Sequence, residues 1–223
     1  MPTDRWSEMD HYIHDHLLAA SRTEFDTVIK ANAAAGLRAI DVPAVQGKFL
    51  NLLVTISGAR RVLEIGTLGG YSAIWMAKAL PTDGKLITLE YEPHHAEVAR
   101  ANFARAGVAD RIEVIIGAAL DTLPQLQARG EAAFDLIFID ADKPNNVGYL
   151  RWALALSRPG TIIVLDNVVR DGQVLDATST DPNVLGSRAA FAFLQNEPRI
   201  DATALQLVGT KGWDGFAMGV VKG

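Results

Sequence analysis

The sequence predicts an α/β protein with a Rossmann-like, doubly wound, mostly parallel seven-stranded sheet, an antiparallel C-terminal strand and extra N-terminal helices. Short apolar runs alternate with helical segments between residues 61 and 166, and glycine or proline marks the joints. This alternation is typical of a parallel sheet covered by helices on both faces. A chain of 223 residues is large enough to bury one core. We therefore expect one domain over residues 1–223, with helices over 1–57 and the Rossmann-like core over 58–223.

The individual elements follow from the same patterns. Helices are expected at about 7–35 and 48–57, separated by a break at 41–47, and then at 71–80, 93–106, 119–129 and 145–157. Strands are expected at 61–65, 85–90, 111–116, 134–140 and 161–166. Beyond these, a polar stretch over 171–187 precedes a helix and two strand-like runs at 204–209 and 215–222. The two runs flank residues 211–215 and are expected to form an antiparallel hairpin at the sheet edge.

The composition excludes several classes of protein. The formal charge of −5, without clusters of lysine and arginine, argues against a nucleic-acid partner. The absence of cysteine excludes disulfides and thiolate-bound zinc. No apolar run reaches the ~20 residues of a membrane span, and the first ten residues lack the basic and apolar parts of a signal peptide. We expect a cytoplasmic protein without a membrane partner.

The most informative stretch runs from Val62 to Ala73. Residues 62–65 form an expected strand, Gly66 to Gly70 a glycine-rich turn, and a helical pattern starts at Tyr71. The N–H groups of such a turn and the positive end of the helix dipole favour a ligand with an anionic end. Glu64 occupies a strand position where an apolar residue is expected, which indicates a use for it. The alternative is a plain strand–turn–helix corner.

The spacing of the glycines indicates which ligand the turn binds. A dinucleotide fingerprint needs glycines at 66, 68 and 71, but Leu68 and Tyr71 stand at two of these positions. A nicotinamide dehydrogenase is therefore disfavoured. Glu90 ends the next strand, where a carboxylate accepts hydrogen bonds from both hydroxyls of a ribose; the alternative is a solvated strand end. The combination is similar to the S-adenosylmethionine site of a class I methyltransferase.

A second group of polar side chains follows two later strands. Asp140 ends one strand, and Asp166 and Asn167 end the next. In a parallel sheet these ends share the carboxyl edge, where ligands bind in open α/β folds. Two carboxylates and an amide carbonyl suit a hard cation such as Mg²⁺. The alternative, that Asp142 and Asp166 cap the following segments without a metal, stays open.

Lys143 follows Asp140 by three residues and is expected to reach the same site. A partly buried lysine beside a divalent cation becomes a usable general base. The alternative is a surface lysine before Pro144. His11, His14 and His16 lack the usual i, i+4 spacing of helical metal ligands, so we interpret them as exposed or capping residues.

Together these residues resemble the cation-dependent O-methyltransferase family, which includes catechol and caffeoyl-CoA O-methyltransferases; the bacterial small-molecule branch is most similar. The resemblance spans about Val42 to Val174 and rests on E-I-G-T-x-x-G-Y-S, Glu90, F-D-x-x-F-I-D-A-D-K and D-N-V. It implies a methyl-donor site, a metal site and a catalytic site. The donor residues would be Val42, Glu64, Gly66, Thr67, Tyr71, Ser72, Glu90, Ala118, Asp140 and Asp142. Asp140, Asp166 and Asn167 would hold the metal, and Lys143 with Asp140 would be catalytic.

The resemblance also implies the reaction. S-adenosylmethionine would give its methyl group to a hydroxyl of a catechol-like small molecule, with Mg²⁺ as the expected cation and Mn²⁺ or Ca²⁺ as alternatives. A homodimer is expected. Trp6, Tyr12, Trp213 and Phe216 are candidate aromatic walls for the phenolic acceptor. The alternatives are a methyltransferase of another acceptor class, acting on tRNA or on nitrogen, and a donor-binding protein without activity.

Overall fold

The protein is built on one seven-stranded sheet with strand order β3-β2-β1-β4-β5-β7-β6. The computed structural model describes the backbone of residues 2–223 and the side chains of residues 5–223. The strands are β1 (Arg61–Ile65), β2 (Lys85–Glu90), β3 (Ile112–Ile116), β4 (Phe134–Ile139), β5 (Ser157–Asp166), β6 (Ile200–Gly209) and β7 (Gly212–Val221). The predicted fold class is confirmed, and all seven predicted strands are present.

The first five strands are parallel and the last two reverse the direction. β1 pairs with β2 and β4, β2 with β3, and β4 with β5, all in parallel register. β7 pairs antiparallel with both β5 and β6. The predicted hairpin is therefore confirmed, with longer strands and a two-residue turn at Thr210 and Lys211. The final strand inserts beside β5, which leaves β6 as the sheet edge.

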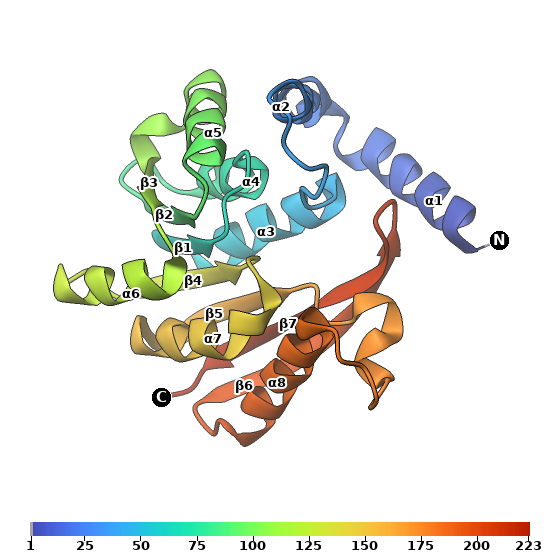
Figure 1. The fold of residues 1–223 in the computed structure, drawn as a ribbon. Helices are drawn as coiled ribbons and strands as arrows, with labels where there is room; N and C mark the ends of the chain where they lie inside the picture. Colours follow the sequence, from blue (N-terminus) through green and yellow to red (C-terminus); the bar gives the residue numbers. More distant parts are fainter. Residues whose placement is uncertain (1) are drawn as a thin grey trace.

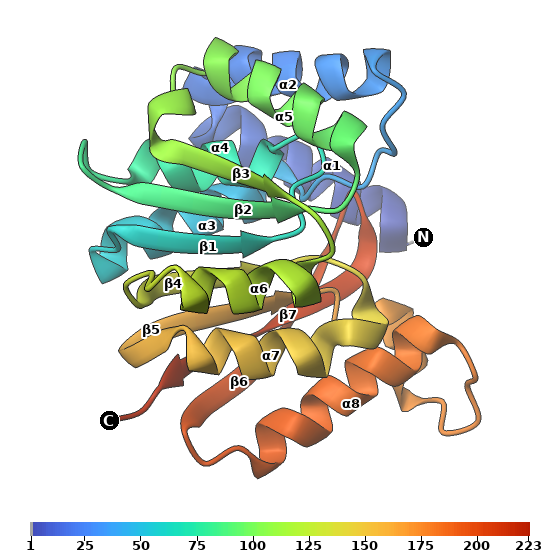
Figure 2. The ribbon, with the colours of Figure 1, turned by 60° about the vertical axis from the view of Figure 1, so that its left-hand side comes forward.

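Helices cover both faces of the sheet (Figures 1 and 2). α6 (Ala119–Ala128), α7 (Asn146–Ala155) and α8 (Pro182–Asn196) lie on one face. On the other lie α3 (Ala44–Ser57), α4 (Tyr71–Ala79) and α5 (Pro93–Arg105), with α1 (Pro2–Leu17) and α2 (Arg22–Ala34) outside them. Short 3₁₀ turns occupy 19–21, 109–111, 143–145 and 170–175. No helix within residues 2–223 is both long and apolar enough to cross a membrane.

Each face of the sheet has its own apolar core because neighbouring strand residues point to opposite faces. On β1, Val62 packs with α3 and α4 residues such as Leu50 and Ile74. Leu63 and Ile65 pack on the other face, with residues of α6 and α7. Burial on both faces explains why the strands read as near-continuous apolar runs.

Several elements start earlier than predicted, among them α1, α3, α8, β5, β6 and β7. α3 starts at Ala44 instead of residue 48. Pro43 is its N-cap residue, and its backbone (φ −58°, ψ 152°) is not helical, so the loop ends at Pro43. β5 starts at Ser157, so it runs through Pro159 and Gly160. α8 starts at Pro182, inside the predicted polar stretch, where the Asp181 side chain accepts a hydrogen bond from the Asn183 N–H.

The turn after β1 requires glycine at residue 66. Gly66 has φ +97°, and a Cβ there would lie 2.1 Å from the Asp140 carbonyl oxygen. Gly58 also has positive φ, +62°, but a Cβ there meets nothing within 4 Å. A side chain at either position would therefore be strained by the positive φ. At Gly66 its Cβ would in addition clash with the backbone of Asp140.

We predict that Gly66→Ala lowers the free energy of unfolding by roughly 3 kcal/mol or more, from strain and clash together. The matched control, Gly58→Ala, should cost about 1 kcal/mol from strain alone. Urea unfolding of both variants measures the difference. Equal losses at the two sites would contradict the close approach of Gly66 to Asp140.

Candidate active site

Three adjoining cavities lie where the strands β1, β2, β4 and β5 end. The turn cavity, about 500 Å³, borders the glycine-rich turn and is lined by residues including Val42, Gly66, Thr67, Tyr71, Ser72, Glu90, Asp142 and Lys143. The Ala118 cavity, about 560 Å³, shares Gly66, Glu90, Ala141 and Asp142 with it and adds Ala118 and Tyr149. The hairpin cavity, about 540 Å³, lies between the β6–β7 hairpin and α3. The turn and hairpin cavities share Asp140 and Asn167.

The Glu90 carboxylate fixes the glycine-rich turn through hydrogen bonds to its backbone. Its Oε2 accepts hydrogen bonds from the Thr67 and Leu68 N–H groups, at 3.1 and 2.7 Å. Its Oε1 accepts one from the Glu92 N–H at 2.9 Å. The sequence predicts that the turn's N–H groups point at an anionic ligand, but two of them point at this carboxylate instead. Glu90 still lines both the turn and the Ala118 cavities, and its Oε1, which accepts one N–H, has a second acceptor site.

Glu64 lies beneath the turn and is fully buried. Ser72 Oγ and Thr88 Oγ1 donate to its two carboxylate oxygens at 2.5 and 2.6 Å. Burial raises the pKa of Glu64 to about 8 despite these hydrogen bonds. Glu64 does not line any of the three cavities, whereas its partner Ser72 does. The Ser72 side chain therefore lies between Glu64 and the turn cavity.

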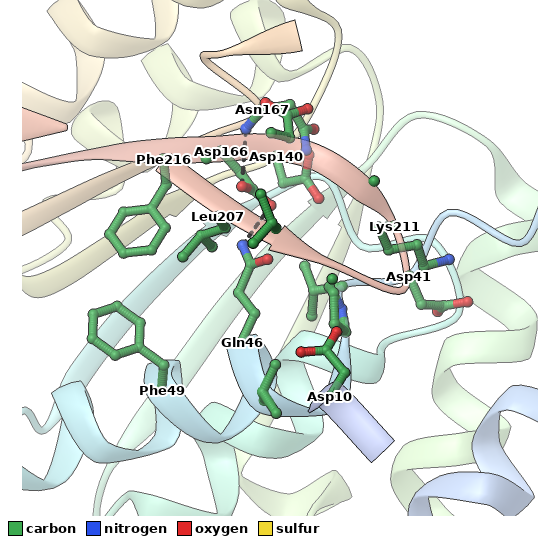
Figure 3. Close-up of a pocket in the computed structure, with 18 of the residues that line it drawn as sticks. Asp10, Asp41, Gln46, Phe49, Asp140, Asp166, Asn167, Leu207, Lys211 and Phe216 are labelled. Carbon is green, nitrogen blue, oxygen red and sulfur yellow. Dashed lines mark hydrogen bonds between the residues drawn. The ribbon is translucent and has the colours of Figure 1, made fainter. Parts of the chain in front are cut away.

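The three predicted metal ligands lie together in the wall of the hairpin cavity (Figure 3). Asp166 is buried, and Gln46 of α3 donates to its Oδ2 at 2.8 Å. Burial, together with the charge of Asp140, raises the pKa of Asp166 to about 7. Asn167 follows with a left-handed backbone, φ +57°. Two carboxylates and an amide that converge in one wall fit the oxygen-rich ligand set of a divalent cation.

Lys143 is a buried residue, which rules out the surface interpretation. It is only 5% exposed, and its Nζ donates to Asp140 Oδ1 at 2.9 Å. Asp142 beside it accepts hydrogen bonds from the Tyr149 hydroxyl and from Asn145 Nδ2. Asp142 makes no side-chain capping bond to the following turn, so the capping interpretation fails for this residue. It lines the turn and Ala118 cavities instead.

The walls of the hairpin cavity are mostly apolar. Phe49 of α3 and Phe216 of β7 face each other with ring centroids 5.1 Å apart (Figure 3), and Ile40, Leu205, Leu207 and Val208 add aliphatic surface. Of the four aromatic walls that the sequence predicts, only Phe216 lines this cavity. Trp6 and Trp213 are not among its lining residues, and Tyr12 is 58% exposed and stacks on His16.

Sequence reasoning missed Gln46, Phe49 and Arg170, all of which line the hairpin cavity. Gln46 was missed because α3 was expected to start at residue 48, so that this polar residue fell in a loop, whereas Phe49 lay inside the expected helix and was read as an ordinary apolar residue. The signal for Gln46 is a buried amide within an otherwise apolar helix. Arg170 carried no signal, because it lies in an irregular segment after β5.

The N-terminal histidines His11, His14 and His16 all lie on α1. His16 Nδ1 lies 2.7 Å from the Tyr12 carbonyl oxygen. Among the described residues, no group of three or more His, Cys, Asp and Glu side chains is arranged to hold a metal. The candidate metal ligands Asp140, Asp166 and Asn167 are two carboxylates and one amide. They therefore do not form a group of three His, Cys, Asp or Glu side chains.

The fold and the position of the cavities define a Rossmann-like protein that binds ligands at the carboxyl edge of its sheet. The model of the O-methyltransferase family matches residues 18–212. A catechol O-methyltransferase of Niastella koreensis is 52% identical over 97% of this chain and 98% of its own. One of Mycobacterium tuberculosis is 52% identical over 93% of both chains. An O-methyltransferase of Bacillus cereus, solved in complex with SAH (S-adenosylhomocysteine), superposes with a TM-score of 0.97 at 53% identity over 99% and 100% of the two chains.

The chain therefore belongs to the O-methyltransferase family, as the sequence predicts, and it is an enzyme. The family model covers the glycine-rich turn, the carboxylate cluster and most of the terminal hairpin.

The buried Glu64 carboxyl makes stability depend on pH. In the folded chain it holds its proton up to about pH 8, whereas in the unfolded chain it loses the proton near 4.5. Between these pH values the folded state binds more protons, so the free energy of unfolding falls as the pH rises. The slope reaches about 1.4 kcal/mol per pH unit.

We predict that Glu64→Gln removes this slope, so that the variant gains stability relative to the wild type from pH 5 to pH 8. Urea unfolding of both proteins at four pH values measures the difference. Asp166 titrates in both proteins, so its contribution cancels. A difference that does not change with pH would contradict a buried, protonated Glu64.

Proposed function

We propose that this enzyme transfers a methyl group from S-adenosylmethionine to a hydroxyl of a vicinal dihydroxy aromatic compound, assisted by a divalent cation and by Lys143 as the base. One observation carries the proposal. Asp140, Asp166, Asn167 and Lys143 converge where the turn cavity meets the hairpin cavity, between a polar space and an apolar one. The relatives named catechol O-methyltransferase and the relative in complex with SAH support the acceptor and the donor.

The turn and Ala118 cavities are the proposed donor site. Glu90 would accept a hydrogen bond from a ribose hydroxyl at the remaining acceptor site of Oε1, and Ala118 and Asp142 would flank the adenosine part. Gly66, Thr67 and Ser72 would hold the methionine end, with Val42 and Tyr71 as walls. Glu64 would supply negative charge beneath the methionine ammonium, acting through Ser72. A cation at that position favours the ionised form of a carboxyl whose pKa burial has raised.

Asp140, Asp166 and Asn167 are the proposed ligands of the divalent cation. The fit rests on the donor chemistry, because the charges of Asp140 and Asp166 repel each other and the one described cation that contacts them, Lys143, pairs with Asp140 alone. When bound, such a cation lowers the pKa of a phenolic hydroxyl and orients two adjacent oxygens. Mg²⁺ is the expected ion, since all three ligands present oxygen.

Lys143 is the proposed general base. Its Nζ lies at the cavity junction, held at 2.9 Å by Asp140 Oδ1. In its neutral form it would accept the proton of the acceptor hydroxyl, and the phenolate oxygen would then attack the donor's methyl carbon. One C–O bond forms as one C–S bond breaks, and S-adenosylhomocysteine leaves. The apolar walls of Phe49 and Phe216 would hold the acceptor ring and exclude water.

We predict that methyl transfer to catechol requires both the cation and Lys143. Transfer measured with radiolabelled donor should proceed with Mg²⁺ and stop in excess EDTA. Lys143→Met should lower kcat by a factor of about 10² to 10⁴, the usual range for a general base.

The matched control is Lys85→Met. Lys85 is the first residue of β2, at the opposite end of the strands, and within residues 5–223 its Nζ donates only to the Asp110 carbonyl oxygen, so loss of the amine should leave transfer unchanged. Transfer that persists in EDTA would remove the metal from the proposal. A fully active Lys143→Met variant would remove the base.

We further propose a homodimer in the cytoplasm, with residues 1–223 acting as one catalytic domain. β6 is an open sheet edge, and α1 packs beside it. Met9, Tyr12, Leu205 and Val208 expose apolar side chains on these two elements, which is typical of a surface that another chain covers.

We predict a mass near twice the 24.0 kDa of the single chain when the purified protein is measured by light scattering. Apolar surface on α1 and β6 would then be buried between the two copies. A single-chain mass at micromolar concentration would contradict the dimer.

A further inference from the structure

We propose that Arg170 anchors an anionic substituent, a carboxylate above all, on the ring of the acceptor. The inference rests on the proposed function and narrows it, because it selects acidic over neutral or cationic dihydroxy aromatics. Arg170 is placed for this role at the junction of the two sites. It lines both the hairpin and the turn cavities, together with Asp140 and Asn167.

The guanidinium of Arg170 has no partner among the side chains and backbone that the structure describes. Among residues 5–223, no hydrogen bond or ion pair of its side chain is formed, and its Nε is buried without an acceptor. A buried N–H donor left unpaired is costly. The planar guanidinium offers five N–H donors and matches a carboxylate through two parallel hydrogen bonds. The missing partner is thus an anion with at least two acceptor atoms.

The other charged groups of the hairpin cavity already have partners. Lys211 Nζ donates to the Ala39 carbonyl oxygen at 2.8 Å. Asp140 accepts from Lys143, and Asp166 accepts from Gln46. Of the two described cations that line this cavity, Lys211 already donates to a carbonyl oxygen, whereas the Arg170 side chain has no partner among residues 5–223. Neutralising a neighbouring carboxylate therefore does not explain the role of Arg170.

The backbone around Arg170 is strained and held in place. Arg170 has φ +57° and Asp171 has φ +54°, which side chains rarely adopt. The Asp214 carboxylate fixes this conformation, because its Oδ1 accepts from the Val169 and Arg170 N–H groups, both at 3.0 Å. The ring of Trp213 packs on Gly172 so closely that a Cβ there would lie 2.7 Å from it. Strain that the surroundings maintain in this way is typical of a positioned functional residue.

A carboxylate could come from the acceptor or from the methionine end of the donor, because Arg170 lines both cavities. We assign it to the acceptor. The turn cavity contains a second arginine, Arg38, which can meet the donor carboxylate. Besides Arg170 and Lys211, the hairpin cavity is lined mainly by apolar side chains and by carboxylates, which repel an acidic ring unless a cation anchors it.

The test compares 3,4-dihydroxybenzoate with catechol, which lacks the carboxylate, in wild type and Arg170→Met. The measured quantity is the ratio of kcat/KM for the acid to kcat/KM for catechol, so a loss common to both acceptors cancels. We expect the ratio to fall about 10- to 100-fold, which corresponds to one charge-assisted contact. The loss should lie in KM for the acid, with KM for S-adenosylmethionine unchanged. Arg170→Lys, which keeps the charge without the planar fork, should give an intermediate ratio.

The matched control is Arg188→Met on α8, whose guanidinium donates to the Asp176 carbonyl oxygen outside the three cavities; its ratio should equal that of the wild type. An unchanged ratio in Arg170→Met would overturn the inference. A raised KM for S-adenosylmethionine with equal losses on both acceptors would assign Arg170 to the donor carboxylate and likewise overturn it.

Failure of the proposed function would be seen separately, as a wild type that methylates neither acceptor. Calorimetric titration of 3,4-dihydroxybenzoate into wild type and Arg170→Met, each with S-adenosylhomocysteine and Mg²⁺, then decides the inference without turnover. Weaker binding by the variant supports it, and equal binding or no binding to either protein overturns it.

Discussion

The whole active site depends on the contact between the ends of β1 and β4. The Asp140 N–H donates to the Ile65 carbonyl oxygen at 2.9 Å, and the glycine-rich turn passes so close to Asp140 that only a glycine fits at residue 66. This contact brings the turn cavity and the carboxylate cluster to the same edge of the sheet. A methyl donor in the proposed donor site and an acceptor in the hairpin cavity would then meet at this edge, with their reacting atoms close enough for transfer.

Buried carboxyl groups and non-glycine residues with positive φ lie together at this same edge of the sheet. Glu64 and Asp166 are buried carboxyls whose pKa values burial raises to about 8 and about 7. The four described non-glycine residues with positive φ are Leu68, Asn167, Arg170 and Asp171, and all lie in or beside the cavity walls. Such features cost stability, and the large apolar cores on both faces of the sheet offset that cost.

The sequence was sufficient for the fold and for the residues at strand ends. Apolar runs and glycine spacing depend on local rules, and the parallel sheet places Asp140 beside Asp166 by topology alone. Residues on irregular segments could not be found in this way. Arg170 is positioned by Asp214, which is 44 residues further along the chain, and no periodicity reports such a contact. The direction of the Thr67 and Leu68 N–H groups was likewise set by a distant residue, Glu90.

The segment between α2 and α3 shows how these distant contacts join the two sides of the site. Ile40, Asp41 and Val42 line both the turn and the hairpin cavities. On the donor side, Asn102 donates to the Gly69 carbonyl oxygen and to Asn32 Oδ1.

Asn32 in turn donates to Asp41 Oδ1 at 2.9 Å. On the acceptor side, Lys211 at the hairpin tip donates to the Ala39 carbonyl oxygen. One short wall is thus held by the glycine-rich turn at one end and by the β6–β7 hairpin at the other. Because both cavities share this wall and protein interiors are closely packed, a change in the shape of one cavity changes the shape of the other.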